Sequence, residues 1–245
     1  MNPETHTHPS VKRAVLLAAG RGTRMRDLTE SLPKPMLPVQ GKPILEHILT
    51  GLRAAGVSDV LIVVGYRADV ITSYFKDGSA YGLNIHYVTQ VVQDGTGRVV
   101  DLAKTFTGTD PFILSYGDIL IDPENYQRLT KIEHHSALVS VKHNEAEIAK
   151  GGCVVVDDQM MLTDLIEKPA GPPPSPWYNA GVYTFTEAVY THTAKLERSP
   201  RGEFELTDAI RTLAQETGSV RAIELRGNWA DVRDPEVLAE LNSAR

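Results

Sequence analysis

The sequence predicts an α/β fold, because short apolar runs typical of buried strands alternate with segments of helical periodicity over the first 141 residues. The run Val11–Ala18 contains β-branched and aliphatic residues without alternation, as expected for a strand buried on both faces. Pro43–Ala55 places its apolar residues at a helical period and ends at Gly56. With 245 residues, of which 42% are hydrophobic and 23% charged, the chain suits one large domain or two small ones with an ample core.

The other elements of the first half follow from the same patterns. Further strands are expected at Val60–Val64, Leu83–Val88, Pro111–Ser115 and Ser136–Val141, and further helices at Asp69–Phe75 and Pro123–His134. Strands joined by helical crossovers run parallel, so a parallel sheet is predicted up to about residue 141.

The chain changes character after residue 141. We expect a hairpin of Gly152–Val156 and Met161–Ile166, a Pro-rich connector at Lys168–Pro176, strands at Gly181–Phe185 and Val220–Leu225, and helices at Leu206–Thr217 and Pro235–Ser243. Thr207 is the candidate N-cap of the first of these helices, and Pro235 suits the first turn of the second. We therefore expect a loose tail over residues 1–10 and one domain over 11–245, with halves 11–141 and 142–245.

Composition and charge narrow the classes of function. Cys153 is the single cysteine, so no internal disulfide or cysteine zinc site can form, and a buried position and a cytoplasmic location are expected. No apolar run approaches the roughly 18–20 residues of a membrane span, and no signal peptide opens the chain, so no membrane partner is expected. The net charge of −6 offers no global basic surface for nucleic acid. Positive charge gathers instead at Arg21, Arg24, Arg26 and Lys34, which favours a small anionic ligand. The sequence leaves a homo-oligomer open.

The most informative segment is Leu16–Arg24, an apolar run that ends in a loop, followed by Pro33-Lys34-Pro35. Gly20 and Gly22 let backbone N–H groups approach an anion closely, because no Cβ intervenes. Arginine and a lysine held between two prolines then supply full positive charge. Together these features predict a triphosphate cradle at the end of a strand.

Three other interpretations of this loop are weaker. A dinucleotide site would need a third glycine where Met25 stands and an acidic residue where Val64 ends the second strand. A P-loop would need Gly-Lys-Ser/Thr after a four-residue spacer, which is absent. A plain structural turn explains two glycines, but it does not explain Arg24 and the proline-flanked Lys34.

These residues resemble the signature of the sugar-1-phosphate nucleotidyltransferases. The match covers nearly the whole chain after residue 11 and consists of Leu17-Ala18-Ala19-Gly20-x-Gly22-Thr23-Arg24, Pro33-Lys34-Pro35-Met36, Gly41-Lys42-Pro43-Ile44, Gly65-Tyr66, Tyr116-Gly117-Asp118, Glu167-Lys168-Pro169, Asn179-Ala180-Gly181 and Trp229-x-Asp231. The resemblance implies a Rossmann-like three-layer αβα domain with a mixed central sheet and a smaller acceptor-binding subregion. The β-helix acyltransferase domain of bifunctional members is not expected within these 245 residues.

The resemblance also implies a reaction, in which an NTP and a sugar 1-phosphate give an NDP-sugar and pyrophosphate. The attacking phosphate is mostly dianionic near pH 7, with a second pKa of about 6, so no general base is required. Arg24 would neutralise the departing pyrophosphate, Lys34 would reach the α-phosphate, and Asp118 and Asp231 would hold Mg²⁺. The implied catalytic residues are Arg24, Lys34 and Asp118, and the implied NTP-binding residues are Leu17, Ala18, Ala19, Gly20, Gly22, Thr23, Arg24, Gln90 and Gly95.

Base choice is less determined. Tyr87-x-x-Gln90 followed by Gly95 resembles the base-reading segment of thymidylyl- and uridylyltransferases, which favours UTP or dTTP. Thr96-Gly97-Arg98 resembles the cytidylyltransferases, so CTP stays close behind, and Gln93 is a rival to Gln90.

The acceptor end of the site departs from the family at two points. The implied acceptor-binding residues are Gly152, Glu167, Lys168, Asn179 and Trp229, where Glu167 and Asn179 would bind sugar hydroxyls and Lys168 the acceptor phosphate. Gly151 replaces the aromatic residue that often precedes the sugar-contacting glycine. After Asp231, Val232-Arg233-Asp234 replaces the usual x-Gly-Thr, so Asp234 is an alternative metal ligand. A cytidylyltransferase acting on phosphocholine or another non-sugar phosphate, and a non-catalytic nucleotide-sugar-binding regulatory protein, are the alternative functions.

Overall fold

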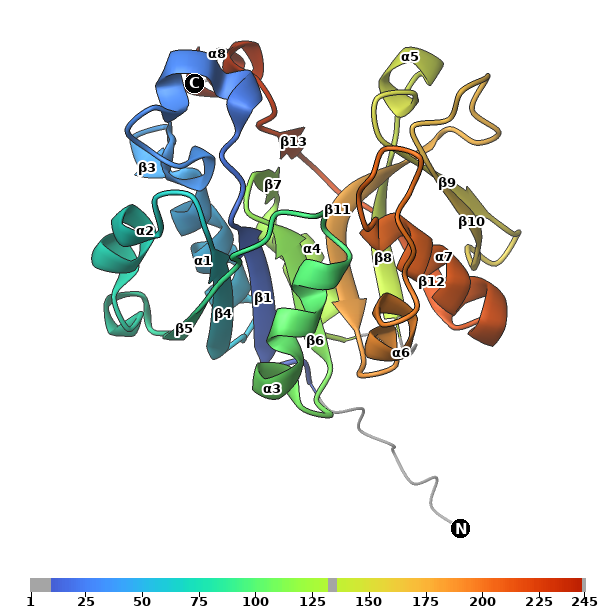
Figure 1. The fold of residues 1–245 in the computed structure, drawn as a ribbon, viewed down its shortest axis with the longest axis horizontal. Helices are drawn as coiled ribbons and strands as arrows, with labels where there is room; N and C mark the ends of the chain where they lie inside the picture. The colour runs from blue at the N-terminus through green and yellow to red at the C-terminus, as the bar shows by residue number, and fades with distance from the viewer. Residues whose placement is uncertain (1–9, 132–135, 244–245) are drawn as a thin grey trace.

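The computed structural model describes residues 10–131 and 136–243 and shows a mixed sheet covered by helices on both faces (Figure 1). The strands are β1 Arg13–Ala18, β2 Pro38–Val39, β3 Lys42–Pro43, β4 Asp59–Val64, β5 Asn84–Thr89, β6 Phe112–Tyr116, β7 Ile119–Ile121, β8 Ser136–Lys142, β9 Gly152–Val156, β10 Leu162–Glu167, β11 Trp177–Phe185, β12 Val220–Glu224 and β13 Trp229–Asp231. The α-helices are α1 Ile44–Ala54, α2 Ala68–Phe75, α3 Lys104–Thr107, α4 Pro123–Leu129, α5 Glu145–Ile148, α6 Val189–Thr193, α7 Leu206–Thr217 and α8 Pro235–Ser243. Short 3₁₀ turns lie at Thr23–Thr29, Lys34–Met36, Ser79–Tyr81 and Arg98–Ala103.

The main sheet runs β10-β9-β11-β6-β1-β4-β5, and β8 and β12 join it through β11. Strands β6, β1, β4 and β5 are parallel neighbours, as the alternation of strands and helices predicts. β11 lies antiparallel beside β6, and β8 pairs with β11 rather than with β6. The predicted parallel sheet therefore holds for four strands and becomes mixed from β11 onward, and the predicted α/β fold class with a mixed sheet is confirmed.

Two hydrophobic cores, one on each face of the sheet, explain why the central strands are apolar throughout. Leu16 of β1 packs in the core formed with α1, α2, α4 and α8. Its neighbour Val15 packs in the other core, formed with the 3₁₀ turn Arg98–Ala103, α6 and α7. Successive side chains of a strand point to opposite faces, so a strand buried on both faces shows no polar alternation.

Three local predictions differ from the structure. The helix predicted over Pro123–His134 ends at Leu129, and residues 132–135 lie outside the described part of the chain. The strand predicted from Gly181 begins at Trp177, so the Asn179-Ala180-Gly181 motif lies inside β11. Thr207 as an N-cap is wrong, because Glu205 occupies the N-cap of α7 and Thr207 lies within its first turn.

Other predictions agree closely with the structure. Helix α7 spans the predicted residues, α8 begins at Pro235, and Cys153 is buried. The tail predicted for residues 1–10 lies outside the described residues except for Ser10. Among residues 10–131 and 136–243, every helix is too short or too polar to cross a bilayer.

Replacing Leu16 by Ala is expected to destabilise the fold by about 2–5 kcal/mol, because the side chain is fully buried and the cavity cannot collapse between two packed layers. Urea unfolding measures the change. The control Val91→Ala, at a side chain that is 86% exposed, should stay within about 0.5 kcal/mol of the wild type. Equal effects of the two substitutions would contradict the two-core description.

Candidate active site

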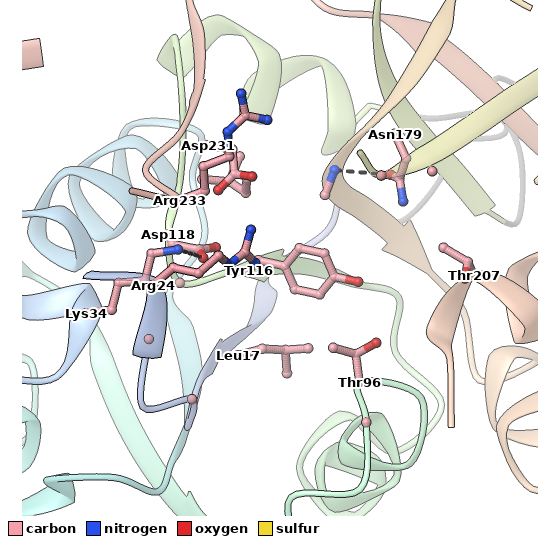
Figure 2. Close-up of a pocket in the computed structure, with 18 of the residues that line it drawn as sticks. Leu17, Arg24, Lys34, Thr96, Tyr116, Asp118, Asn179, Thr207, Asp231 and Arg233 are labelled. Atoms are coloured by element: carbon pink, nitrogen blue, oxygen red, sulfur yellow. Dashed lines mark hydrogen bonds and ion pairs between the residues drawn. The ribbon is translucent and has the colours of Figure 1, made fainter. Parts of the chain in front are cut away.

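A cavity of about 880 Å³ lies at the carboxyl ends of β1, β5 and β6, where ligands of open α/β sheets bind. Figure 2 shows Arg24, Lys34, Asp118 and Asp231 on one side of this pocket and Asn179 and Thr207 on the other. Every residue predicted from the sequence to bind a ligand lines it: Leu17, Ala18, Ala19, Gly20, Gly22, Thr23, Arg24, Lys34, Gln90, Gly95, Asp118, Gly152, Glu167, Lys168, Asn179, Trp229 and Asp231. The structure brings these positions together, while their individual roles stay predictions.

The loop Gly20–Arg24, called the phosphate loop below after its predicted role, is in direct contact with the proline-flanked Lys34. Gly22 has φ +69°, and a Cβ at this position would lie 2.8 Å from Cβ of Lys34. The side chain of Thr29 donates to the Gly22 carbonyl at 3.2 Å, and the buried Met25 anchors the 3₁₀ turn that follows. No α-helix follows Gly22 before residue 44 in this described stretch, which removes the helix N-terminus that a dinucleotide site requires.

A second glycine brings the carboxylate Asp118 to the same place. The N–H of Gly117 donates to the carbonyl of Leu17 at 2.9 Å, and an added Cβ would lie 2.9 Å from that oxygen. The turn after β6 therefore packs directly on the end of β1. Nζ of Lys34 lies 2.5 Å from Oδ2 of Asp118, and the lysine is 8% exposed.

A two-stranded ribbon places the second carboxylate beside the first. β7 pairs antiparallel with β13, in a register that sets Asp231 opposite Ile119. The N–H of Val232 also donates to the carbonyl of Asp118 at 3.0 Å. Two aspartates that are far apart in sequence thus become neighbours at the sheet edge.

The proximity of Asp118 and Asp231 affects the pKa of Asp231. Burial and the neighbouring Asp118 raise the pKa of Asp231 to about 6, while Lys34, Arg233 and Arg24 oppose the rise. In the described part of the chain, His, Cys, Asp and Glu side chains nowhere gather in threes as a metal cluster. A cation held by these two carboxylates would complete its shell with phosphate oxygens and water, which is the set that Mg²⁺ prefers.

The loop after Asp231, whose sequence differs from the family pattern, is held in place by ion pairs. Arg233 contacts Glu147 of α5 at 2.9 Å and Asp234 at 3.5 Å. The other oxygen of Asp234 accepts from the N–H of Val237 at 3.0 Å. Both oxygens of Asp234 are engaged, so Asp231 is the better partner for Asp118.

The segment expected to read the base follows β5. Nε2 of Gln90 donates to the carbonyl of Val92 at 3.0 Å, whereas Nε2 of Gln93 donates to the carbonyl of Ala19 at 3.1 Å. Gln93 thus ties this segment to the phosphate loop, while the side chain of Gln90 is held within its own loop. Both glutamines line the cavity.

The backbone at position 95 requires a glycine, for a packing reason that the sequence did not indicate. It has φ +119°, and an added Cβ would lie 2.4 Å from the carbonyl oxygen of Phe204. The backbone of Phe204 donates to Asp94 and accepts from Gly97, both at 2.8 Å. The guanidinium carbons of Arg98 and Arg198 lie 3.6 Å and 4.9 Å from the centroid of the Phe204 ring. Residues 94–98 and 198–204 therefore form one packed unit.

The acceptor end is built on β9, β10 and β11. Burial raises the pKa of Glu167, the last residue of β10, and Arg201 faces it at 3.5 Å. Gly152 is required by close packing, since an added Cβ would lie 2.9 Å from Cβ of Asn179. Asn179 bonds the hydroxyl of Tyr183, and the indole N–H of Trp229 donates to a β11 carbonyl at 3.0 Å.

Several further cavity-lining residues were not predicted as site residues. Tyr178, Arg201, Thr207 and Arg233 are among them. Arg201 pairs with Glu205 at 2.6 Å. The sequence pattern that could have identified Arg201 as a site residue is an arginine just before a helix, followed by two glutamates. Oγ1 of Thr207 is buried without a hydrogen-bond partner among the described residues. Their approach to the cavity depends on tertiary packing and not on a local pattern.

The phosphate loop, the paired carboxylates and the sheet edge define a nucleotidyltransferase-type α/β site. The nucleotidyl transferase family model matches residues 13–245, and the chain belongs to this family. The resemblance to sugar-1-phosphate nucleotidyltransferases is thereby confirmed.

Known relatives agree in fold and sequence. The chain is 38% identical over 229 residues to the bifunctional protein GlmU of Methanocaldococcus jannaschii, covering 94% of this chain but only 53% of that protein. It is 34% identical to the UTP–glucose-1-phosphate uridylyltransferase AglF of Haloferax volcanii, covering 91% of this chain and 92% of the relative. A crystal structure of a UDP-glucose pyrophosphorylase complexed with UDP-glucose superposes with a TM-score of 0.87 at 24% identity, over 95% of this chain and 97% of that one.

Asp231→Asn is expected to stabilise the metal-free protein relative to the wild type more strongly at pH 7 than at pH 5. The folded pKa of about 6 exceeds the ordinary 3.8, so the stability that Asp231 contributes is present below pH 4 and lost as pH rises through 6. The advantage of the variant should grow by about 1 kcal/mol over this interval. Urea unfolding in EDTA measures it, and an advantage independent of pH would contradict the assignment.

Proposed function

We propose that this protein transfers a nucleotidyl group from a pyrimidine NTP to a sugar 1-phosphate, with Mg²⁺, and releases pyrophosphate. The observation that carries the proposal is the convergence of Gly22, Lys34, Asp118 and Asp231 at one end of a cavity that extends to Glu167. Half of the cavity wall supplies cations and backbone N–H groups for a triphosphate. The other half supplies carboxylate and amide groups for a hydroxylated acceptor.

The chain's own groups act on charge and position. An acceptor phosphate oxygen attacks the α-phosphorus while the bond to the β-phosphate oxygen breaks, and pyrophosphate leaves. The nucleophile is already ionised near pH 7, so the barrier lies in bringing two anions together. Gly20, Gly22 and Thr23 offer donors to the β- and γ-phosphates, and Arg24 balances the charge of the leaving pyrophosphate.

Magnesium fits the two carboxylates that the ribbon of β7 and β13 holds together. Asp118 and Asp231 would hold the ion, which would supply charge neutralisation at the phosphates. The raised pKa of Asp231 supports this assignment, because two half-buried carboxylates in close proximity are costly without a cation. Lys34, released from Asp118 when that carboxylate binds a cation, would reach the α-phosphate.

UTP or dTTP is the favoured nucleotide, with CTP close behind. An amide presents one donor and one acceptor to a pyrimidine edge, and Gln90 and Gln93 both line the cavity next to Gly95. The contact of Gln93 with Ala19 leaves Gln90 as the preferred base reader, because its amide is held only by its own loop.

The two halves of the domain would divide the substrates. Residues 11–141 carry the phosphate loop and the base segment, and residues 142–245 carry Gly152, Glu167, Lys168 and Asn179 for the acceptor. Asp231 comes from the second half but completes the site of the first. A cytoplasmic location and a homo-oligomer stay predictions from the sequence.

Asp118→Asn is expected to lower kcat by roughly 10²-fold or more, because it removes transition-state charge stabilisation. Steady-state pyrophosphate release with saturating Mg²⁺ measures the loss. Asp110→Asn is the matched control, since Asp110 forms a surface ion pair with Arg13 and does not line the cavity. Near-normal turnover of the Asp118 variant would refute the metal assignment.

A pyrophosphate-release screen tests the proposal as a whole. It crosses UTP, dTTP, CTP and purine NTPs with sugar 1-phosphates and phosphocholine. Turnover with a pyrimidine NTP and a sugar 1-phosphate is the expected result. Turnover with phosphocholine alone would favour the cytidylyltransferase alternative. Binding of NDP-sugars by calorimetry without turnover of any pair would favour the regulatory alternative.

A further inference from the structure

The Tyr178 side chain fills the space that a side chain at position 151 would need. Gly151 precedes β9 and is buried, and an ideal Cβ built on it would lie 2.2 Å from the hydroxyl oxygen of Tyr178 and 2.6 Å from Cζ. Real Cβ atoms do not approach so closely, so any other residue at position 151 would displace the tyrosine. The glycine therefore makes room for the phenol of β11.

The hydroxyl of Tyr178, a residue that lines the cavity, makes no hydrogen bond within the described part of the chain. Tyr178 and Gly151 both line the pocket, yet the tyrosine as a whole is 8% exposed. Among the described residues, no group forms a hydrogen bond with its hydroxyl. Burial raises the pKa of Tyr178 to about 12, so the phenol keeps its proton and can donate at neutral pH.

The ring is fixed from several sides. It packs edge-on against Trp229 with centroids 5.6 Å apart and against His143 at 5.3 Å. Its backbone pairs with Val141 of β8 and Cys153 of β9. A side chain on a strand, held by aromatic neighbours, presents its polar tip with little conformational freedom.

We propose that Tyr178 determines acceptor specificity, its hydroxyl above Gly151 donating a hydrogen bond to a hydroxyl oxygen of a polyhydroxylated phosphate. The inference rests on the function proposed above and names the substrate class of the same cavity. The phenol donor and the Glu167 carboxylate, which lines the same cavity, form a donor and acceptor set of the kind that reads sugar hydroxyls. Phosphocholine carries no hydroxyl and would leave this donor unpaired.

Tyr178→Phe is expected to raise the KM of the acceptor about 3- to 10-fold, the scale of one neutral hydrogen bond, with kcat and the KM of the NTP nearly unchanged. One monodeoxy analogue of the acceptor should show the same rise with the wild type and no added rise with the variant. Tyr74→Phe, at an exposed tyrosine on α2, is the matched control and should change nothing. An unchanged acceptor KM in Tyr178→Phe would overturn the proposal.

The role of Gly151 is tested by a double-mutant cycle. Gly151→Ala should weaken acceptor binding in the wild-type background and have no effect in a Tyr178→Ala background, where the clash is gone. Equal losses in both backgrounds would overturn the coupling. Unfolding curves for each variant separate loss of fold from loss of binding.

The two proposals fail separately. Turnover with phosphocholine and not with sugar phosphates would overturn the Tyr178 assignment while nucleotidyl transfer stands. If no substrate pair turns over, the proposed function fails. The Tyr178 contact is then measured as calorimetric affinity for sugar 1-phosphates, and equal affinities of wild type and Tyr178→Phe would overturn it.

Discussion

The antiparallel pairing of β7 with β13 is the constraint on which the site depends. It brings together Asp118 and Asp231, and it anchors the end of the second half of the chain on the turn that follows β6. Burial, followed by repulsion from Asp118, raises the pKa of Asp231 to about 6. A raised carboxylate pKa in a cavity is a common mark of a functional site, and it agrees with the Mg²⁺ site proposed here.

Lys34 connects this carboxylate pair to the phosphate loop. Its stem packs against Gly22, and its ammonium pairs with Asp118. A lysine that is 8% exposed is uncommon unless it is paired, and the flanking prolines limit the backbone conformations at this position. Packing therefore fixes the backbone of the loop and of Lys34, while the lysine side chain can exchange Asp118 for another anionic partner.

The sequence was most informative where the signal is local. The apolar run before Gly20, the helical period of α1 and the Pro-rich connector each follow from neighbouring residues, and each lies where predicted. The insertion of β11 beside β6 was not predictable, because strand order depends on contacts between distant segments. Thr207 was wrong as an N-cap, because the helix already begins at Leu206 and Glu205 takes that position. Tyr178 was missed because only strand pairing places it over Gly151.

The packing of Phe204 has a consequence for any exchange of the loops around the cavity. Its backbone is hydrogen-bonded to Asp94 and Gly97, and its ring contacts the guanidinium groups of Arg98 and Arg198. Residues 94–98 and 198–204 are thus packed as one unit, although about a hundred positions of chain separate them. A chimera that exchanges residues 90–98 alone would lose the contacts between residues 94–98 and 198–204. Exchange of both segments together would preserve these contacts. A change in either segment therefore reaches the other through the backbone of Phe204.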